Sequence, residues 1–598
     1  MRSPLWTAKY TALLKLLRSP LALVSATLLV IWCVGMFGRG YWTPDEPREA
    51  DIAWRMSWQA DKAVPLLAGE AFCEKPPLTY WLAAVPIRLF GTAAWIARLP
   101  NLLYALITAL SVGLLARRCA GRLAGVVAAA AMSTFLLSYQ VAIWLATDAP
   151  LLAAVSVALL GAYRGFYAVN SRERVRGYSL MHVALGLGFL SKSAAAWMVP
   201  ALAIVTLAIW EKRWRELLRW ELYVGLVLQA AMICTWIWFV YAGPDGMAHL
   251  KVFFWNNLVG RFTRVDAPSE VQYAAAHRNF PGKYLVELPL YLFPWTLLVA
   301  AALRRAWQRR GIAFDEYRPV RFALAASLPA LAFLSLAATA RNVYFAPALP
   351  GAAVLLAWWL RDLSAGADRW DLRALRATGA LLLVGTLVSA AALSLTAVDA
   401  WHTRSTPAVF IVISAVGLIA AVWLALRAWA AAAGRDRIQR ALWSLFLAYV
   451  ALLAGPASQA YHQVDAWQDL QSIARAIGHD ADDKPLILFA PDETTRAIID
   501  MYARTTVGLV PGPIDTAAID RLRAAAGAAP QSRVVVQLPG RESVARRLGR
   551  RFGQARSGPA AELDAPSAPV WAVAAQLRLA ASYSLPNGRR YALLEPLP

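Results

Sequence analysis

Long apolar runs separated by short polar stretches occupy the first three quarters of the chain. A helix needs about 20 residues of this kind to cross a bilayer, so the pattern predicts a bundle of about thirteen transmembrane helices. The expected spans are 21–38, 96–116, 123–139, 142–162, 178–191, 194–210, 220–242, 284–303, 322–340, 343–360, 377–396, 407–427 and 441–456. Residues 1–456 are therefore expected to form one all-α transmembrane domain.

Two longer polar loops interrupt this pattern, at 39–95 and 243–283. The first is predicted to contain two helices that lie at the membrane surface, over 47–59 and 78–90. Pro47 suits the first turn of the earlier helix, because its fixed φ and missing N–H cost little there.

Residues 457–598 have a different pattern, in which short apolar runs alternate with polar helical segments. Such alternation is typical of a small α/β domain. Strands are expected over 486–489 and 534–536, and helices over 492–503, 515–526 and 541–553.

Composition agrees with a membrane protein, since 59% of the 598 residues are hydrophobic and only 16% are charged. In a soluble chain, the net charge of +23 would suggest a nucleic-acid partner. Here the lysines and arginines concentrate in alternate loops, which the positive-inside rule assigns to the cytoplasm. These loops lie at 117–122, 172–176, 212–219, 304–310, 369–376 and 435–440. The chain is expected to begin inside and end outside, and no nucleic-acid partner is expected.

The segment 41–51, directly after the first span, is dense in carboxylates, aromatic residues and proline. Charges packed against a membrane span are costly and usually functional. Asp45 is therefore a candidate catalytic residue, Arg48 a candidate phosphate ligand, and Glu46 a candidate for an acceptor cavity. The alternative is a solvated helix start, where acidic residues are favoured by the helix dipole.

A second charged segment, Glu74-Lys75-Pro76-Pro77, precedes the helix that contains Tyr80. An ammonium fixed beside prolines near the headgroup plane would suit a phosphate. Lys75 is thus a candidate donor-phosphate ligand, and Tyr80 a candidate for the acceptor cavity. The alternative is that Lys75 only extends toward lipid headgroups.

Three further outward positions carry charge at the ends of predicted spans. Asp148 is either a second catalytic carboxylate or a helix N-cap, and the two roles are compatible. Lys192 lies between two closely spaced spans and needs a partner, for which an anion is suitable. Arg341 and Tyr344 lie at an outer turn, where the arginine fork suits phosphate, although simple anchoring is the alternative.

His277 and Arg278 lie in the second outer loop. Imidazole with the carboxylate of Glu74 could hold a zinc-like divalent ion, but a surface histidine is the more ordinary interpretation. Arg278 is a candidate for the acceptor cavity.

The sequence lacks a Walker-type loop, a dinucleotide fingerprint, a His-Glu-x-x-His helix and a Gly-x-Ser-x-Gly elbow. Protease, ATPase and oxidoreductase functions therefore have no support.

Taken in order, these motifs resemble the large membrane-embedded glycosyltransferases of the GT-C fold. The resemblance is closest to the aminoarabinose transferase family, which is related to protein O-mannosyltransferases. The motifs are Asp45-Glu46-Pro47-Arg48, Glu74-Lys75-Pro76-Pro77, Arg98-Leu99-Pro100, Asp148, Gly188-Phe189-Leu190-Ser191-Lys192, His277 and Arg341-Asn342-Val343-Tyr344. Two departures, Ser191-Lys192-Ser193 for Thr-Lys-Gly and Arg341 for lysine, keep the charge but leave the sugar open.

The resemblance implies a bacterial inner-membrane enzyme, monomeric and with its site facing the periplasm. It implies transfer of 4-amino-4-deoxy-L-arabinose from undecaprenyl phosphate to a phosphate of lipid A, a modification linked to polymyxin resistance. Nucleotide sugars and ATP are cytoplasmic, so outward transfer independently requires a donor carried across the membrane on a lipid. Lys192, Arg341 and the other cations would neutralise its phosphate.

Two alternatives stay open at this point. One is a related GT-C transferase that moves mannose, galacturonate or another lipid-linked sugar to a lipid or protein. The other, from a different class, is a transporter or flippase of lipid-linked sugars. No cofactor is certain, and a divalent metal is the one candidate.

Overall fold

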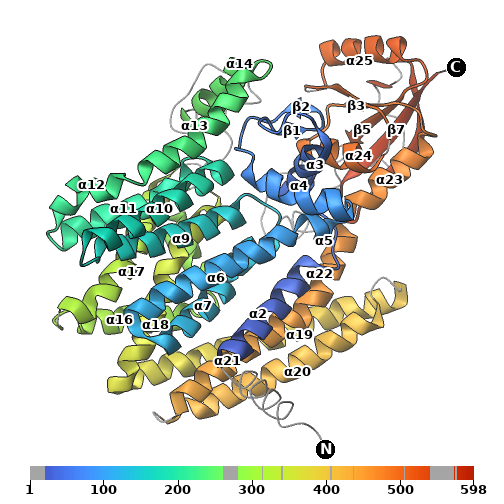
Figure 1. Cartoon of the computed structure of the whole chain (residues 1–598). Coiled ribbons are helices and arrows are strands. Elements are labelled where there is room, and N and C mark those ends of the chain that lie inside the picture. The colour runs from blue at the N-terminus through green and yellow to red at the C-terminus, as the bar shows by residue number, and fades with distance from the viewer. Residues whose placement is uncertain are drawn as a thin grey trace, which may run out of the picture.

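A computed structural model describes residues 20–259, 280–312, 314–337, 341–403, 407–434, 437–503, 505–512, 514–538, 571–572 and 575–597. Within these residues, a large helical body is joined to a small sheet domain near the C-terminal end (Figure 1). The sheet domain lies over α3 (Asp45–Trp58) and α4 (Leu78–Phe90), at one end of the helical body.

The long helices of the body follow the apolar runs of the sequence. They are α2 (Pro20–Met36), α6 (Leu99–Ala120), α7 (Arg122–Thr134), α8 (Leu136–Ile143), α9 (Asp148–Phe166), α10 (Ser171–Lys192), α11 (Ala195–Trp210), α13 (Leu226–Ala242), α15 (Lys283–Tyr291), α16 (Thr296–Gln308), α17 (Phe314–Leu336), α18 (Leu349–Asp362), α19 (Arg369–Thr403), α20 (Ala408–Ala431), α21 (Ile438–Ala454) and α22 (Pro456–Trp467). Among the described residues, eight helical segments are long and apolar enough to cross a membrane, or up to ten if two bent pairs each count as one span. The chain is therefore a multi-pass membrane protein.

The two bent pairs are where the predicted spans 123–139 and 284–303 differ from the structure. Helices α7 and α8 meet at 68°, and the extended backbone at Phe135 lets the Leu136 N–H donate to Phe293 O at 2.9 Å. Helices α15 and α16 meet at 110° across a break that contains Pro294, which has no N–H to continue a helix.

The predicted span 142–162 begins six residues later in the structure, at Asp148. The residues before it complete α8, which ends at Ile143, and a short connection then leads to Asp148 as the first residue of α9.

The two helices predicted in loop 39–95 are present as α3 and α4. Nine of the 14 residues of α3 are buried, including the run 49–53, so the helix is enclosed on most sides by the rest of the protein. Helix α4 follows Pro77 and ends at Gly91, whose φ of 97° is strained for residues with a Cβ. Between them lies the short hairpin β1 (Leu66–Leu67) and β2 (Glu70–Ala71), and the short helix α5 (Ala94–Ala97) follows α4.

The predicted α/β domain contains a five-stranded sheet in the order β4-β3-β5-β7-β6. Strands β4, β3 and β5 are parallel, and β7 and β6 extend the sheet antiparallel. The bounds are β3 (Leu486–Phe489), β4 (Val507–Val510), β5 (Arg533–Leu538), β6 (Leu577–Ser584) and β7 (Arg590–Pro596). The sequence pattern found β3 and β5 but missed the other three strands.

Helices cover both faces of this sheet. Apolar residues of α23 (Leu470–Asp480) and α24 (Glu493–Tyr502) pack on one face, and those of α25 (Thr516–Ala528) pack on the other. All four residues of β3 are consequently buried. The first of these two cores includes buried residues of α3 and α4, so the sheet domain is docked directly on loop 39–95.

A buried ion-pair cluster fixes that loop to the helical body. The side chain of Glu46 is 0% exposed and accepts hydrogen bonds from Arg39 at 2.6 Å and from Arg98 at 2.7 and 2.8 Å. The backbone N–H groups of Trp42 and Leu145 donate to the same carboxylate at 2.8 and 2.9 Å. Burial alone would raise the pKa of Glu46, but the charges of Arg39 and Arg98 outweigh it and lower the pKa to about 2.

Replacing Glu46 with Gln should therefore lower the free energy of unfolding by about 3–5 kcal/mol, because two buried guanidinium groups would lose their counter-charge. Thermal unfolding of detergent-purified protein measures this as a lower midpoint temperature. The matched control is Asp315→Asn, which removes an exposed ion pair with Arg318 and should leave the midpoint almost unchanged. Equal midpoints for Glu46→Gln and the wild type would contradict a structural role for this cluster.

Candidate active site

The first residue of α3, Asp45, lies at the centre of a cluster of charged side chains. Its carboxylate accepts hydrogen bonds from both Nη atoms of Arg341, one of them at 3.1 Å, and from Arg48 Nη2 at 3.1 Å. The Asp45 side chain is only 15% exposed. Residues separated by almost 300 positions thus form one ion-pair cluster.

The ionisation of Asp45 is set by these neighbours. Burial alone would raise its pKa, but the hydrogen bonds and charge of Arg341, together with the charges of Lys75 and Arg48, lower the pKa to about 2. Asp45 is therefore a carboxylate at neutral pH.

Aromatic packing positions Arg341. This residue precedes the 3₁₀ helix η6 (Asn342–Ala348), and its carbonyl accepts a hydrogen bond of 2.6 Å from the Tyr284 hydroxyl. The ring of Phe345 in η6 lies 6.1 and 5.9 Å, between centroids, from the rings of Tyr284 and Tyr291. This contact holds the turn that presents the guanidinium to Asp45.

A second ion pair lies beside the first. Lys192, the last residue of α10, places Nζ 2.5 Å from Asp148 Oδ1 and 4.8 Å from the centroid of the Tyr344 ring. The electrostatic environment of Arg341 includes both Tyr344 and Asp148, so the two ion pairs belong to one site. Asp148 makes no side-chain capping hydrogen bond, and its predicted role as an N-cap is wrong. Its carboxylate binds Lys192 instead.

Lys75 approaches the cluster from the loop between β2 and α4. It forms an ion pair with Glu49, whose side chain is almost fully buried, and its charge also acts on Asp45. Tyr80, expected in the acceptor cavity, is buried beneath this pair and close to Glu49. Glu46 is likewise buried, in the cluster described above.

The sheet domain contributes a residue that the sequence did not identify. Glu493, at the start of α24, accepts a hydrogen bond of 2.5 Å from Arg48 Nη1, while Thr494 donates to the Pro44 carbonyl at 3.1 Å. An acidic pair at the start of a helix, as at 492–493, is typical of a helix cap. Asp492 does cap α24 by accepting from the Thr495 N–H, but Glu493 faces the site.

The metal prediction is only partly covered by the structure. Its histidine, His277, and the neighbouring Arg278 lie outside the described residues. Glu74 lies next to Lys75, and its backbone carbonyl accepts a hydrogen bond from Asn257. Across the described ranges, no group of three or more His, Cys, Asp or Glu side chains is placed to hold a metal ion.

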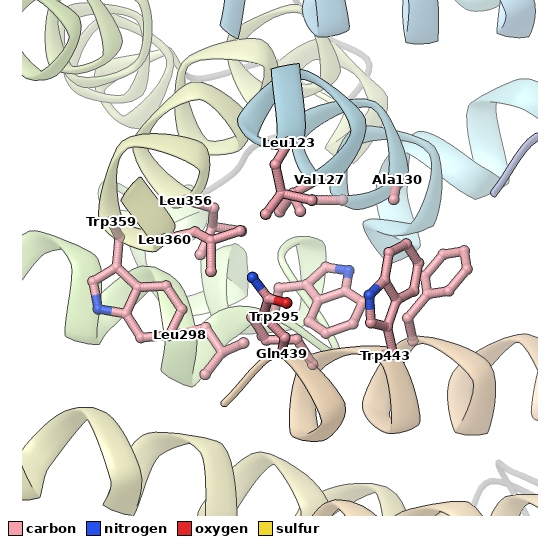
Figure 2. A pocket seen from close by; sticks show the side chains of 13 residues that line it. Leu123, Val127, Ala130, Trp295, Leu298, Leu356, Trp359, Leu360, Gln439 and Trp443 are labelled. Atoms are coloured by element: carbon pink, nitrogen blue, oxygen red, sulfur yellow. The ribbon is translucent and has the colours of Figure 1, made fainter. Parts of the chain in front are cut away.

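An apolar pocket lies in the helical body, lined by side chains of α7, α16, α18 and α21 (Figure 2). Leu123, Trp295, Trp359 and Trp443 contribute to its wall, and Gln439 is the polar side chain there. None of the charged cluster lines it. The pocket uses the C-terminal half of α18, whereas the cluster lies near the opposite end, so it is suited to hydrocarbon and not to the charged chemistry.

Comparison with known proteins shows which families and structures this chain is similar to. Residues 74–239 match the family model described as dolichyl-phosphate-mannose-protein mannosyltransferase. An undecaprenyl phosphate-alpha-4-amino-4-deoxy-L-arabinose arabinosyl transferase of Pseudomonas paraeruginosa is 30% identical over 419 residues, which cover 67% of this chain and 71% of the relative. The protein of the same name from Edwardsiella ictaluri is 29% identical over 60% of this chain and 62% of its own.

The crystal structure of ArnT from Cupriavidus metallidurans bound to undecaprenyl phosphate is similar over 96% of this chain and 97% of that chain, with a TM-score of 0.69 and 19% identity. The same protein in the apo state gives a TM-score of 0.67. The chain therefore has the fold of that protein, and the GT-C fold expected from the sequence is confirmed.

The lowered pKa of Asp45 predicts how its contribution to stability depends on pH. A depressed pKa in the folded state stabilises the protein above the unfolded-state pKa of about 3.9, and this contribution disappears as the pH falls through about 2. The midpoint difference between wild type and Asp45→Asn should thus be constant from pH 8 to about pH 5 and shrink below about pH 4. Thermal unfolding across this range measures it. A difference that vanishes between pH 7 and pH 5 would instead indicate a carboxyl group that titrates near neutrality.

Proposed function

Because the chain belongs to the undecaprenyl phosphate-alpha-4-amino-4-deoxy-L-arabinose arabinosyl transferase family, we propose that it moves this aminosugar from undecaprenyl phosphate to a phosphate of lipid A. The chain is a membrane-embedded glycosyltransferase. The observation that supports this substrate class most directly is the ion-pair cluster around Asp45, at one end of the helical body.

The donor phosphate is the ligand for the cations of the cluster. Lys75, Arg48, Lys192 and Arg341 come from four separate segments and form ion pairs with three carboxylates, those of Asp45, Glu49 and Asp148. A lipid phosphate at this end of the helical body would bind the four cations, while its hydrocarbon chain stays among the apolar helices. Tyr344, which packs on Lys192, completes this group.

In the proposed reaction, an oxygen of the acceptor phosphate attacks C1 of the sugar. The bond between C1 and the phosphate oxygen of the carrier breaks, and its electron pair leaves with undecaprenyl phosphate. The cations stabilise the charge that accumulates on this leaving group, an effect worth about 3–4 kcal/mol for a single preorganised donor.

Asp45 is proposed to position the reacting groups. A phosphate acceptor is already a nucleophile at neutral pH and needs no base. With its pKa near 2, Asp45 would be a weak base, since an effective general base titrates close to the working pH. Asp148 is the second proposed catalytic carboxylate, acting beside Lys192.

The proposed topology has about thirteen spans, an inside N-terminus, and a periplasmic domain over 457–598 that follows the transmembrane domain 1–456. The alternation of basic loops supports it. This orientation places the site at the periplasmic face of the inner membrane, where the lipid-linked donor is available.

We further propose that the enzyme is a monomer and that Glu74 and His277 are its candidate metal ligands. Glu46 and Tyr80 are reassigned from the acceptor cavity to the scaffold, because both are fully buried.

Among GT-C transferases, the alternative is a donor with a different lipid-linked sugar, because related enzymes are expected to use the same arrangement of site residues for other sugars. A lipid-linked sugar transporter is the alternative from another class. Transporters typically place their charged sites near the middle of the bilayer at broken helices. The cluster described here instead lies at helix ends, which favours a transferase.

Wild-type protein in proteoliposomes should transfer radiolabelled aminosugar from undecaprenyl phosphate to lipid A. Replacing Asp45 with Asn should reduce the transfer rate at least about 100-fold, because the variant keeps the size of the side chain but removes its charge. Thin-layer separation of the labelled lipids measures the product. Membrane insertion and monodispersity of the variant serve as controls for folding. Movement of label across the membrane without covalent transfer would support the transporter, and near-normal transfer by Asp45→Asn would exclude a central role for this residue.

Replacing Lys75 with Ala should weaken binding of undecaprenyl phosphate itself about tenfold or more, because a charge-assisted contact with the phosphate is lost. Titration of the lipid against purified protein measures the affinity. Since Lys75→Ala alone leaves the buried Glu49 without its counter-charge, the matched variant is Lys75→Ala with Glu49→Gln. If the double variant binds the lipid as tightly as Glu49→Gln alone, Lys75 is not a phosphate ligand.

A further inference from the structure

The contact between Glu493 and Arg48 has a geometry that domain docking alone does not require. One arm of the Arg48 guanidinium binds Asp45 at 3.1 Å, and the other binds Glu493 at 2.5 Å. A single guanidinium group therefore bridges the two carboxylates, which lie on two sides of Arg48. A ring lying alongside Arg48 with C1 near Asp45 would have its far side at Glu493.

Exposure distinguishes Glu493 from the other carboxylates around Arg48. Its side chain is 53% exposed, whereas those of Asp45 and Glu49 are 15% and 1% exposed. All four of Asp45, Glu49, Asp148 and Glu493 are engaged by a cation within the cluster, so exposure and not pairing sets Glu493 apart. Glu493 is thus the carboxylate that can accept a further donor from the solvent side.

The charge balance of the site points to the same kind of ligand. Within the described residues, four cations (Arg48, Lys75, Lys192 and Arg341) face five carboxylates (Asp45, Glu49, Glu74, Asp148 and Glu493). A site for a purely anionic sugar phosphate would be expected to contain an excess of cations. A donor that carries both a phosphate and an ammonium matches a site without such an excess.

We propose that Glu493, from the C-terminal sheet domain, recognises the protonated amine on C4 of the donor sugar and so makes the enzyme selective for an aminosugar. This inference rests on the proposed function. It gives the sheet domain a direct part in substrate selection, because α24 then supplies a contact to the sugar as well as one to Arg48.

Simple docking is the competing explanation, and the same interface offers a control for it. Arg496, one turn further along α24, forms an ion pair of 2.9 Å with Glu70 of the β1–β2 hairpin. Glu70 is 63% exposed, which is close to the exposure of Glu493, but it has no contact with Asp45 or Arg48. Glu70→Gln therefore removes an equivalent interdomain ion pair away from the sugar.

The test compares two donors that differ at a single position. One is undecaprenyl phosphate-linked 4-amino-4-deoxy-L-arabinose, and the other is undecaprenyl phosphate-linked L-arabinose, which has a hydroxyl at C4. The selectivity is the ratio of kcat/KM for the amino donor to kcat/KM for the hydroxyl donor. Glu493→Gln should lower this ratio about tenfold, because a charge-assisted hydrogen bond to the ammonium is lost. Glu493→Asp should retain part of the selectivity, and Glu70→Gln should retain all of it.

Each result distinguishes the explanations. Equal loss with both donors in Glu493→Gln, at unchanged selectivity, would overturn the proposal and leave Glu493 as a positioning residue for Arg48. An equal drop in selectivity for Glu70→Gln would also overturn it, because domain docking would then be the cause. A wild-type enzyme that transfers neither sugar would refute the proposed function, and this inference with it.

Discussion

A carboxylate with no exposed surface, that of Glu46, joins the segments that meet above the helical body. It holds Arg39 at the end of α2, Arg98 at the start of α6 and the backbone of Leu145 before α9. Because Glu46 is the second residue of α3, the same bonds fix the position of Asp45. A buried charge of this kind is stable only with every partner in place, so the start of α3 has little freedom to shift.

The ion-pair cluster around Asp45 is built differently, because its partly exposed ion pairs connect segments that are distant in sequence. Arg341 reaches Asp45, Lys192 reaches Asp148, and Arg48 reaches Glu493. Partly exposed pairs are weaker than buried ones because water and salt screen them. A phosphate can therefore exchange with a carboxylate here at a cost that would be prohibitive at Glu46.

Sequence reasoning located the helices and most charged residues of the cluster, because hydrophobic periodicity and charges at helix ends are local signals. It failed where the structure depends on tertiary context. The break between α7 and α8 at Phe135 is accompanied by a hydrogen bond from the Leu136 N–H to the Phe293 carbonyl. No local sequence motif predicts this break. The burial of Glu46 depends on two arginines from other segments. The role of Glu493 depends on docking of a domain more than 400 residues downstream of Arg48, where an acidic helix start looks like an ordinary cap.

The pairing of the cations has a consequence for the order of events in the proposed reaction. In the structure described here, Arg341 and Arg48 are bound to Asp45, and Lys75 is bound to Glu49. A donor phosphate that takes over these cations leaves Asp45 with fewer counter-charges, in a position that is only 15% exposed. An under-compensated carboxylate in such surroundings favours positive charge nearby, and the sugar develops positive charge at C1 as the bond to phosphate breaks. Donor binding would thereby prepare Asp45 for the transition state, which accounts for a carboxylate that is ionised yet fully paired before the substrate arrives.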